Sequence, residues 1–242
     1  MKVFAYVGSP RGEKSLGVQF IQMVKEKIES MDNSIEFNIF RDDQLNIKEH
    51  TGSIMDFNNG QSLYNDDMKI IEEEMLSSDF IILISPVYAH NVSSQMKKFI
   101  DRISYWLHLF KLSGKFGYAV SIADNNGIDY VSDYLKKVMQ YMGIYVLGTT
   151  GIQGNKLASD VNTLQSYANH LAKKILISET IEEIDTEYEQ ESFFKNQKNM
   201  YLKSDTKSKE KDFWEKNGYF EFNTFEELFI SKLKQFKGNK IK

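Results

Sequence analysis

The first 178 residues alternate between two patterns of apolar and polar positions. Short apolar runs indicate five strands, at residues 2–7, 35–40, 80–84, 116–122 and 144–150. Apolar residues spaced three or four apart indicate five helices, at residues 16–31, 68–76, 93–109, 128–142 and 157–177. Because strands and helices alternate along the chain, we expect an α/β fold with a doubly wound, five-stranded parallel sheet.

The third strand, at residues 80–84, is apolar at every position, which is typical of a central parallel strand covered by helices on both faces. Right-handed crossovers place the loops after the first, third and fourth strands at one edge of the sheet. These loops span residues 8–15, 85–92 and 123–128. We expect a ligand at this edge, since doubly wound sheets bind ligands at the carboxyl ends of their strands.

The loop between the first strand and the first helix combines glycine and hydroxyl residues. A tight turn there leaves the N–H groups of the first helical turn without partners, and with the helix dipole they favour an anion, usually a phosphate. Ser9 and Ser15 add hydroxyl donors, and Arg11 and Lys14 add positive charge. The alternative is that Ser15 only caps the helix and that Gly8 only turns the chain.

The same loop nearly matches the nucleotide P-loop pattern G-x-x-x-x-G-K-[ST], with Lys14 and Ser15 in their expected places. Glu13 stands where the pattern requires its second glycine, and it would crowd the loop and bring negative charge to a phosphate. The third strand ends in Ser85-Pro86 rather than in a magnesium-binding aspartate. The G-x-G-x-x-G dinucleotide motif is also absent, so the sequence disfavours both an NTPase and a standard Rossmann site.

Composition limits the chemistry further. The hydrophobic share of 41% and the charged share of 26% are ordinary for a globular protein, and a net charge of −4 without a basic face disfavours nucleic acid as a partner. Cysteine is absent, which excludes disulfides, thiolate catalysis and cysteine-ligated iron–sulfur or zinc sites. The four histidines lack ligand spacing, so we predict no metal site. Because we see neither a secretory signal pattern nor a membrane-length apolar run, we expect a cytoplasmic protein without membrane spans.

The character of the chain changes at residue 179. An acidic stretch at residues 182–191 is followed by a lysine-rich one at residues 195–211, and such charge runs are usually solvated. The same region is too rich in aromatic residues for a disordered tail, with Phe194, Trp214 and Phe225 among them. We therefore divide the chain into a domain at residues 1–178 and a helical extension at residues 179–242 that packs on the domain or on a partner subunit.

Three motifs resemble those of a known family. They are Gly8-Ser9-Pro10-Arg11 after the first strand, Ser85-Pro86-Val87-Tyr88 with Asn91-Val92 after the third, and Met96-Lys97-Lys98-Phe99-Ile100-Asp101-Arg102 on the next helix. Residues 1–178 thereby resemble the NADPH-dependent FMN reductases of flavodoxin-like fold, with strand order 2-1-3-4-5, and especially the branch that includes the iron–sulfur flavoproteins. The segment from Phe213-Trp214 to Gly218-Tyr219 is similar to the end of some family members.

The resemblance implies that FMN binds at the three loops. Its phosphate would lie among Ser9, Pro10, Arg11 and Ser15. Its ribityl chain and ring edge would lie along Pro86, Val87, Tyr88, Ala89 and Asn91, and its pyrimidine side would face Asp124, Asn126 and Gly127. For Tyr88 the alternative is an ordinary partly buried aromatic residue, and we interpret His90 as a surface or hydrogen-bonding histidine rather than a catalytic one.

A reductase of this family would pass hydride from NADPH or NADH through bound FMN to a small-molecule electron acceptor, such as a quinone, a flavin or another electrophile. The flavin itself carries this chemistry at N5, so no catalytic side chain is expected. Relatives form dimers or tetramers, which implies a homodimer or tetramer here. Two alternatives remain, a flavodoxin-like electron carrier that does not oxidise NAD(P)H, and a binding or assembly protein that has lost the flavin.

Two features depart from the family pattern. Gly17 stands where many relatives carry a threonine that helps to hold the phosphate. The glycine, which lacks that hydroxyl, would weaken FMN binding. The connection at residues 46–64, where the iron–sulfur relatives keep their cysteines, contains none. This absence excludes the cluster and its electron route.

Overall fold

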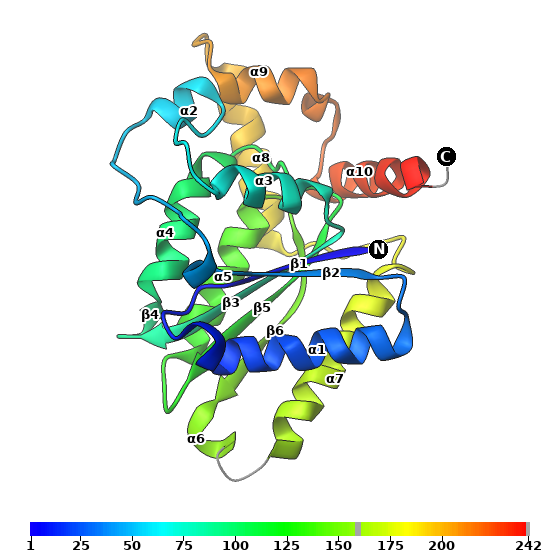
Figure 1. Cartoon of the computed structure of the whole chain (residues 1–242). Helices are drawn as coiled ribbons and strands as arrows, with labels where there is room; N and C mark the ends of the chain where they lie inside the picture. Colours follow the sequence, from blue (N-terminus) through cyan, green and yellow to red (C-terminus); the bar gives the residue numbers. More distant parts are fainter. Residues whose placement is uncertain (158–160, 241–242) are drawn as a thin grey trace.

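The structure, a computed structural model, describes residues 1–157 and 161–240 and is built around one sheet (Figure 1). Five parallel strands lie in the order β2-β1-β3-β5-β6, and a short sixth strand, β4, pairs antiparallel with β3. The bounds are β1 Lys2–Val7, β2 Glu36–Arg41, β3 Phe80–Tyr88, β4 Asn91–Val92, β5 Phe116–Ala123 and β6 Tyr145–Gln153. The predicted α/β class and the predicted order of the five parallel strands are confirmed, and β4 adds to them.

Helices cover both faces of the sheet. They are α1 Leu16–Met31, α2 Met55–Asn59, α3 Met68–Ser77, α4 Ser94–Ile103, α5 Ile128–Tyr141, α6 Gly154–Leu157, α7 Val161–Ser178, α8 Tyr188–Lys203, α9 Lys209–Lys216 and α10 Phe225–Lys240. In Figure 1, α1 and α7 lie below the sheet and α3 lies above it. Part of the predicted helix at residues 157–177 falls on residues 158–160, outside the described residues. No described helix has the length and apolar character needed to cross a membrane.

Alternate residues of β1 divide the core between the two faces of the sheet. Val3, Ala5 and Val7 belong to the core formed with α1 and α7. Phe4 and Tyr6 belong to the core formed with α3, α4 and α5. All five side chains are buried, as expected for a parallel strand with helices on both sides.

α1 occupies the predicted residues and begins at the predicted cap. The Ser15 hydroxyl accepts a hydrogen bond from the Val18 amide at 3.1 Å, which satisfies one donor of the first turn. Phe20, Val24 and Ile28 are buried in the core on this side of the sheet. The helix thus has the apolar face that its sequence periodicity indicated.

β3 continues beyond the predicted end at residue 84, through Pro86 to Tyr88. The Ile84 carbonyl accepts a hydrogen bond from the Gly8 amide at 3.0 Å, on the side of β3 that faces β1. Because backbone groups of a strand alternate in direction, the nitrogen of Pro86, two residues later, points to the same side. β1 has already ended at Val7 on that side. The proline therefore removes no hydrogen bond between strands, and β3 continues past it. The prediction that this strand ends at residue 84 is wrong.

β3 and β4 form a tight hairpin at the carboxyl edge of the sheet. Tyr88 pairs with Asn91, which leaves Ala89 and His90 as the two turn residues. Both have left-handed backbones, with φ of 49° and 61°, as a two-residue turn of type I′ requires. Since neither is glycine, asparagine or aspartate, the turn holds strain of roughly 1–2 kcal/mol per residue.

In two segments the structure differs from the elements that the sequence pattern predicts. The polar connection after β2 contains a 3₁₀ turn at Asp42–Gln44 and the short helix α2, which ends at Gly60 with φ of 67°. The predicted helix at residues 93–109 ends at Ile103 and passes into a 3₁₀ turn. The following segment is fixed by distant residues, because the His108 carbonyl accepts from the Trp214 indole at 2.9 Å.

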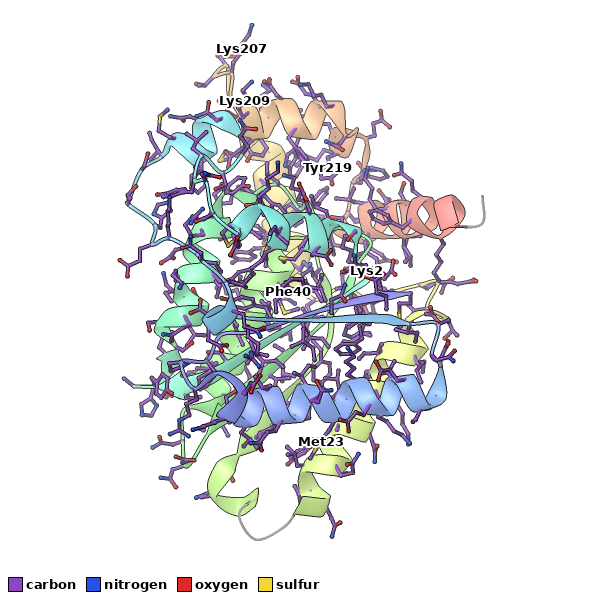
Figure 2. The ribbon with its side chains drawn as sticks, in the orientation of Figure 1. Lys2, Met23, Phe40, Lys207, Lys209 and Tyr219 are labelled. Carbon is purple, nitrogen blue, oxygen red and sulfur yellow. The ribbon has the colours of Figure 1, made fainter. Side chains whose placement is uncertain are left out.

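The C-terminal helices α8, α9 and α10 pack around Phe110. Its ring lies 5.4 Å from that of Phe194, 5.8 Å from that of Trp214 and 5.6 Å from that of Phe225, measured between centroids. The Tyr219 hydroxyl, labelled in Figure 2, donates to the Phe110 carbonyl at 3.2 Å. These aromatic residues join the core of the sheet, while the division of the chain at residue 178 stays a prediction.

Candidate functional site

The loops after β1, β3 and β5 enclose a cavity of about 230 Å³ at the carboxyl edge of the sheet. Six predicted site residues line it: Ser9, Arg11, Ser15, Pro86, Tyr88 and Asp124. Six others lie in the same loops or in the β3–β4 hairpin without lining it: Pro10, Val87, Ala89, Asn91, Asn126 and Gly127. The fold thus brings half of the predicted residues together around one cavity, and their role in binding stays a prediction.

The loop after β1 presents two hydroxyl groups and a cation to this cavity. Ser9 and Ser15 are buried, at 5% and 4% exposure, and Arg11 is exposed. The Arg11 amide donates to Ser9 Oγ at 3.3 Å. The residues Gly12–Lys14 then form a 3₁₀ turn that leads to the cap of α1. Hydroxyl groups, a guanidinium and the N-terminus of a helix together favour an anion here.

The outer side of this loop is held by an ion-pair network from β2. Arg41 Nη1 lies 3.0 Å from Glu13 Oε1, and Arg41 Nη2 lies 3.0 Å from Asp43 Oδ2. Asp43 packs against Gly12, which has φ of 53° and where a Cβ atom would lie 2.6 Å from Asp43 Oδ2. Glu13, at the position of the second P-loop glycine, is therefore engaged by an arginine.

Gly17 lies in the first turn of α1, where it lines the cavity and is buried. A Cβ atom there would lie 3.0 Å from a side-chain carbon of Ile84 and 3.2 Å from side-chain carbons of Ile122 and Val7. Three apolar side chains thus fill the space that a larger residue would need. A threonine at this position would have to push these side chains aside by a few tenths of an ångström.

The β3–β4 hairpin forms a second, more open hollow. His90, Asn91, Tyr130 and Tyr134 line a space of about 460 Å³, and the His90 and Tyr130 rings meet at 65° with centroids 5.5 Å apart. Asn91 Oδ1 accepts from the Val92 amide at 2.8 Å. Asn91 therefore lines this hollow rather than the cavity. Sequence reasoning missed Tyr130, because nothing local distinguishes it from other surface tyrosines on helices.

The loop after β5 is held between the hairpin and the end of β6. The side-chain amides of Gln153 and Asn155 donate to Asn125, at 3.4 and 2.8 Å. Gly127 has φ of 85°, and a Cβ atom there would lie 2.8 Å from Val87 Cγ1. Glycine therefore lets this loop pass close to the hairpin. The approach of Gly127 to the flavin stays a prediction.

Gly154, at the start of α6, also lines the cavity. A Cβ atom there would lie 2.8 Å from Asp124 Oδ1, so glycine lets the two loops approach. Sequence reasoning missed this residue because it expected the last strand to end at residue 150, whereas β6 continues to Gln153.

Arg102 of α4 is fully buried and anchors the connection at residues 46–64. Its guanidinium pairs with Asp66 and donates to the Lys48 carbonyl at 2.8 Å and to the Ser62 hydroxyl at 3.0 Å. The centre of the Tyr64 ring lies 3.7 Å from Arg102 Cζ. Burial by itself raises the pKa of Asp66, but hydrogen bonds from Arg102 and from the Lys48 and Met68 amides, together with the charge of Arg102, outweigh it and leave the pKa lowered.

Known proteins similar in sequence include two iron–sulfur flavoproteins. That of Archaeoglobus fulgidus is 26% identical over 229 residues, which cover 90% of this chain and 100% of that protein. One from Methanocaldococcus jannaschii is 34% identical over 131 residues, 52% of this chain and 65% of that protein. A cysteine-held cluster does not fit this chain, which has no cysteine. Within the described residues, no three His, Asp or Glu side chains gather as a metal site would require.

The fold is shared with the solved structure of a flavone reductase, at 12% identity and a TM-score of 0.61 over 77% of this chain and 66% of that one. At such low identity the likeness concerns the fold alone. A family model described as NADPH-dependent FMN reductase matches residues 1–156. This range contains every predicted site residue and the whole sheet. The chain therefore belongs to the NADPH-dependent FMN reductase family.

Proposed function

We propose that this protein is an FMN-dependent NAD(P)H oxidoreductase that passes hydride from a nicotinamide through bound FMN to a small acceptor, such as a quinone, a flavin or another electrophile. Family membership gives the coarser statement, a flavin-dependent oxidoreductase that uses FMN with NAD(P)H. The finer proposal rests on the cavity at the carboxyl edge, which is lined by Ser9, Arg11 and Ser15 and by the partly exposed Tyr88.

The residues around the loop after β1 fit the phosphate of FMN. Ser9 and Ser15 are buried beside the N-terminus of α1, a helix of 16 residues, and Arg11 lines the same cavity. A phosphomonoester carries about two negative charges at neutral pH. Hydroxyl donors, free first-turn amides and a guanidinium would each stabilise that charge. We assign these three side chains to the phosphate.

The flavin would extend from there along the ends of β3 and β5. Pro86 and Tyr88 would form one wall, and Asp124, Asn126 and Gly127 would approach the pyrimidine edge. When bound, FMN supplies two-electron hydride chemistry at its N5 atom. The protein's part is then to orient the substrates and to limit access of water, so we propose no general acid or base.

Both substrates would use the same opening of the cavity in turn. Such sharing predicts ping-pong kinetics, with parallel lines in double-reciprocal plots against NADPH and acceptor. Intersecting lines would mean that the two substrates bind together and would contradict this part of the proposal.

The first experiment is an absorbance spectrum of the purified protein after FMN is added and the excess is removed, followed by anaerobic addition of NADPH. Retained flavin bands that bleach with NADPH or NADH support the reductase. Bands that persist with both nucleotides indicate an electron carrier. A protein that retains no flavin would contradict the assignment of the cavity.

Two neighbouring cations provide a matched test of the phosphate assignment. Arg11 lines the cavity, whereas Lys14 is exposed in the same loop and does not line it. We expect Arg11→Gln to weaken FMN binding about tenfold, as for loss of a charge-assisted hydrogen bond, and Lys14→Gln to weaken it less than about twofold. Fluorescence titration of the apoprotein with FMN gives both constants, and equal losses would contradict the assignment.

We also propose that two or four copies of the chain assemble. Tyr88 and Tyr130 are 44% and 67% exposed, and a second copy over the hairpin and the start of α5 would cover them. Sedimentation velocity measures the mass in solution, and a monomer at all concentrations would contradict this proposal.

A further inference from the structure

Ser93 joins three elements at the carboxyl edge of the sheet. It is fully buried just before α4. Its hydroxyl oxygen accepts from the Met96 amide at 3.0 Å, which caps α4, and its own amide donates to Ser85 Oγ at 3.1 Å. Its hydroxyl proton is donated to the Gly8 carbonyl at 2.5 Å. One side chain therefore connects α4, β3 and the loop after β1.

The Gly8 carbonyl matters because it belongs to the same peptide plane as the Ser9 amide. In a trans peptide the C=O and N–H groups point in opposite directions. Holding the Gly8 carbonyl toward α4 therefore turns the Ser9 N–H away from α4. Within the part of the chain that the structure describes, this N–H donates to no residue, and Ser9 itself lines the cavity.

The contact between Gly8 and α4 is close as well. A Cβ atom at Gly8 would lie 2.7–2.8 Å from Met96 Cβ, Cα and N. The loop is thus pressed against the first turn of α4 at the residue whose carbonyl Ser93 holds. Packing sets the distance between the two elements, and the hydroxyl sets the rotation of the peptide plane.

We propose that Ser93 is a positioning residue for the phosphate of FMN: by holding the Gly8 carbonyl, it aims the Ser9 amide into the cavity. The inference rests on the proposed function, because the anion is taken to be that phosphate. Ser93 itself does not line the cavity.

The test compares FMN with riboflavin, which lacks the phosphate. For each variant, the ratio of the riboflavin to the FMN dissociation constant measures what the phosphate contributes to binding. We expect Ser93→Ala to lower this ratio about tenfold. Ser93→Thr, which keeps the hydroxyl, is expected to stay within about threefold of the parent ratio.

Ser208→Ala is the matched control. Ser208 caps α9 by accepting from the Lys211 amide at 3.1 Å, so this variant also loses a serine cap but has no contact with the loop after β1. Its ratio should stay within about twofold of the parent value. If Ser93→Ala weakens both ligands equally, or if Ser208→Ala lowers the ratio as far, then Ser93 acts only on stability and the inference is wrong.

A second readout separates this inference from the proposed function. If the parent protein binds neither flavin, the proposed function fails. The Ser9 amide can still be followed by NMR in ¹⁵N-labelled protein during titration with inorganic phosphate. A shift of this signal that saturates in the parent and weakens in Ser93→Ala supports the positioning role. An equal response in both proteins, or none in the parent, overturns it.

Discussion

Replacing Arg102 with methionine removes the buried cation that holds the connection at residues 46–64 against α4. The guanidinium makes hydrogen bonds to Lys48, Ser62 and both carboxylate oxygens of Asp66. Both side chains of the Arg102–Asp66 pair are fully buried. Removing one partner of a buried pair leaves the other charge without compensation and costs about 3–5 kcal/mol. We therefore expect Arg102→Met to lower the free energy of unfolding by about 3–5 kcal/mol.

Urea unfolding followed by circular dichroism measures this loss. Lys97→Met is the matched control, because Lys97 pairs with Asp101 on the same helix but both side chains are at least 40% exposed. Exposed pairs of this spacing contribute about 0.3–0.5 kcal/mol. The double variant Arg102→Met with Asp66→Leu should regain part of the loss, since it leaves no buried charge unpaired.

Two results would refute the reasoning. A loss below about 1 kcal/mol would mean that water reaches the pair and that its burial does not determine its energy. A double variant less stable than Arg102→Met would mean that Asp66 stabilises the connection chiefly through its own bonds to the Lys48 and Met68 amides, at 2.9 and 3.2 Å.

Three further predictions concern the core and acid stability. Gly17→Thr should lower the free energy of unfolding by about 1–3 kcal/mol, because its Cβ atom would crowd Ile84, Ile122 and Val7, and should not tighten FMN binding; tighter binding in a titration would contradict this. Trp214→Ala should cost about 3–5 kcal/mol in urea unfolding, whereas Leu202→Ala, 56% exposed, should cost less than about 0.5 kcal/mol. The pKa of Asp66 is lowered despite burial, through Arg102 and the Lys48 and Met68 amides, so its stabilisation is present above an unfolded pKa of about 3.9 and is lost as pH falls through the lower folded pKa. Asp66→Asn should therefore be less stable than the parent at neutral pH and converge with it in acid, and a constant difference down to about pH 2 would contradict this.

The elements that the sequence predicted well are those set by nearby residues. α1 has the predicted bounds because Ser15 caps it and because Phe20, Val24 and Ile28 repeat on one side. Ser9, Arg11 and Ser15 line one cavity, as their closeness in sequence suggested, and their binding of an anion stays a prediction. The order of the parallel strands follows from the alternation of strand and helix and from the family resemblance.

The features that the sequence did not reveal depend on distant contacts. Pro86 lies within β3 only because β1 ends first on the side toward which its nitrogen points. α4 stops at Ile103, and the segment after it is bonded to Trp214. At the site, the pairing of the short strand β4 with β3 places Asn91 beside a separate hollow instead of the cavity. In each case the deciding partner lies in another element, where local periodicity carries no information.

The packing of the C-terminal helices has a consequence for the order in which the protein is made. Trp214 and Tyr219 bond to carbonyls 106 and 109 positions earlier in the chain. At roughly 5–20 residues per second, the segment around Phe110 waits about 5–20 seconds on the ribosome for these partners. Strands β5 and β6 follow β1 to β4 out of the ribosome during that interval, while the aromatic core beside them is still open. We therefore expect the nascent chain to expose an apolar surface, of the kind that molecular chaperones bind, until α9 and α10 close over it.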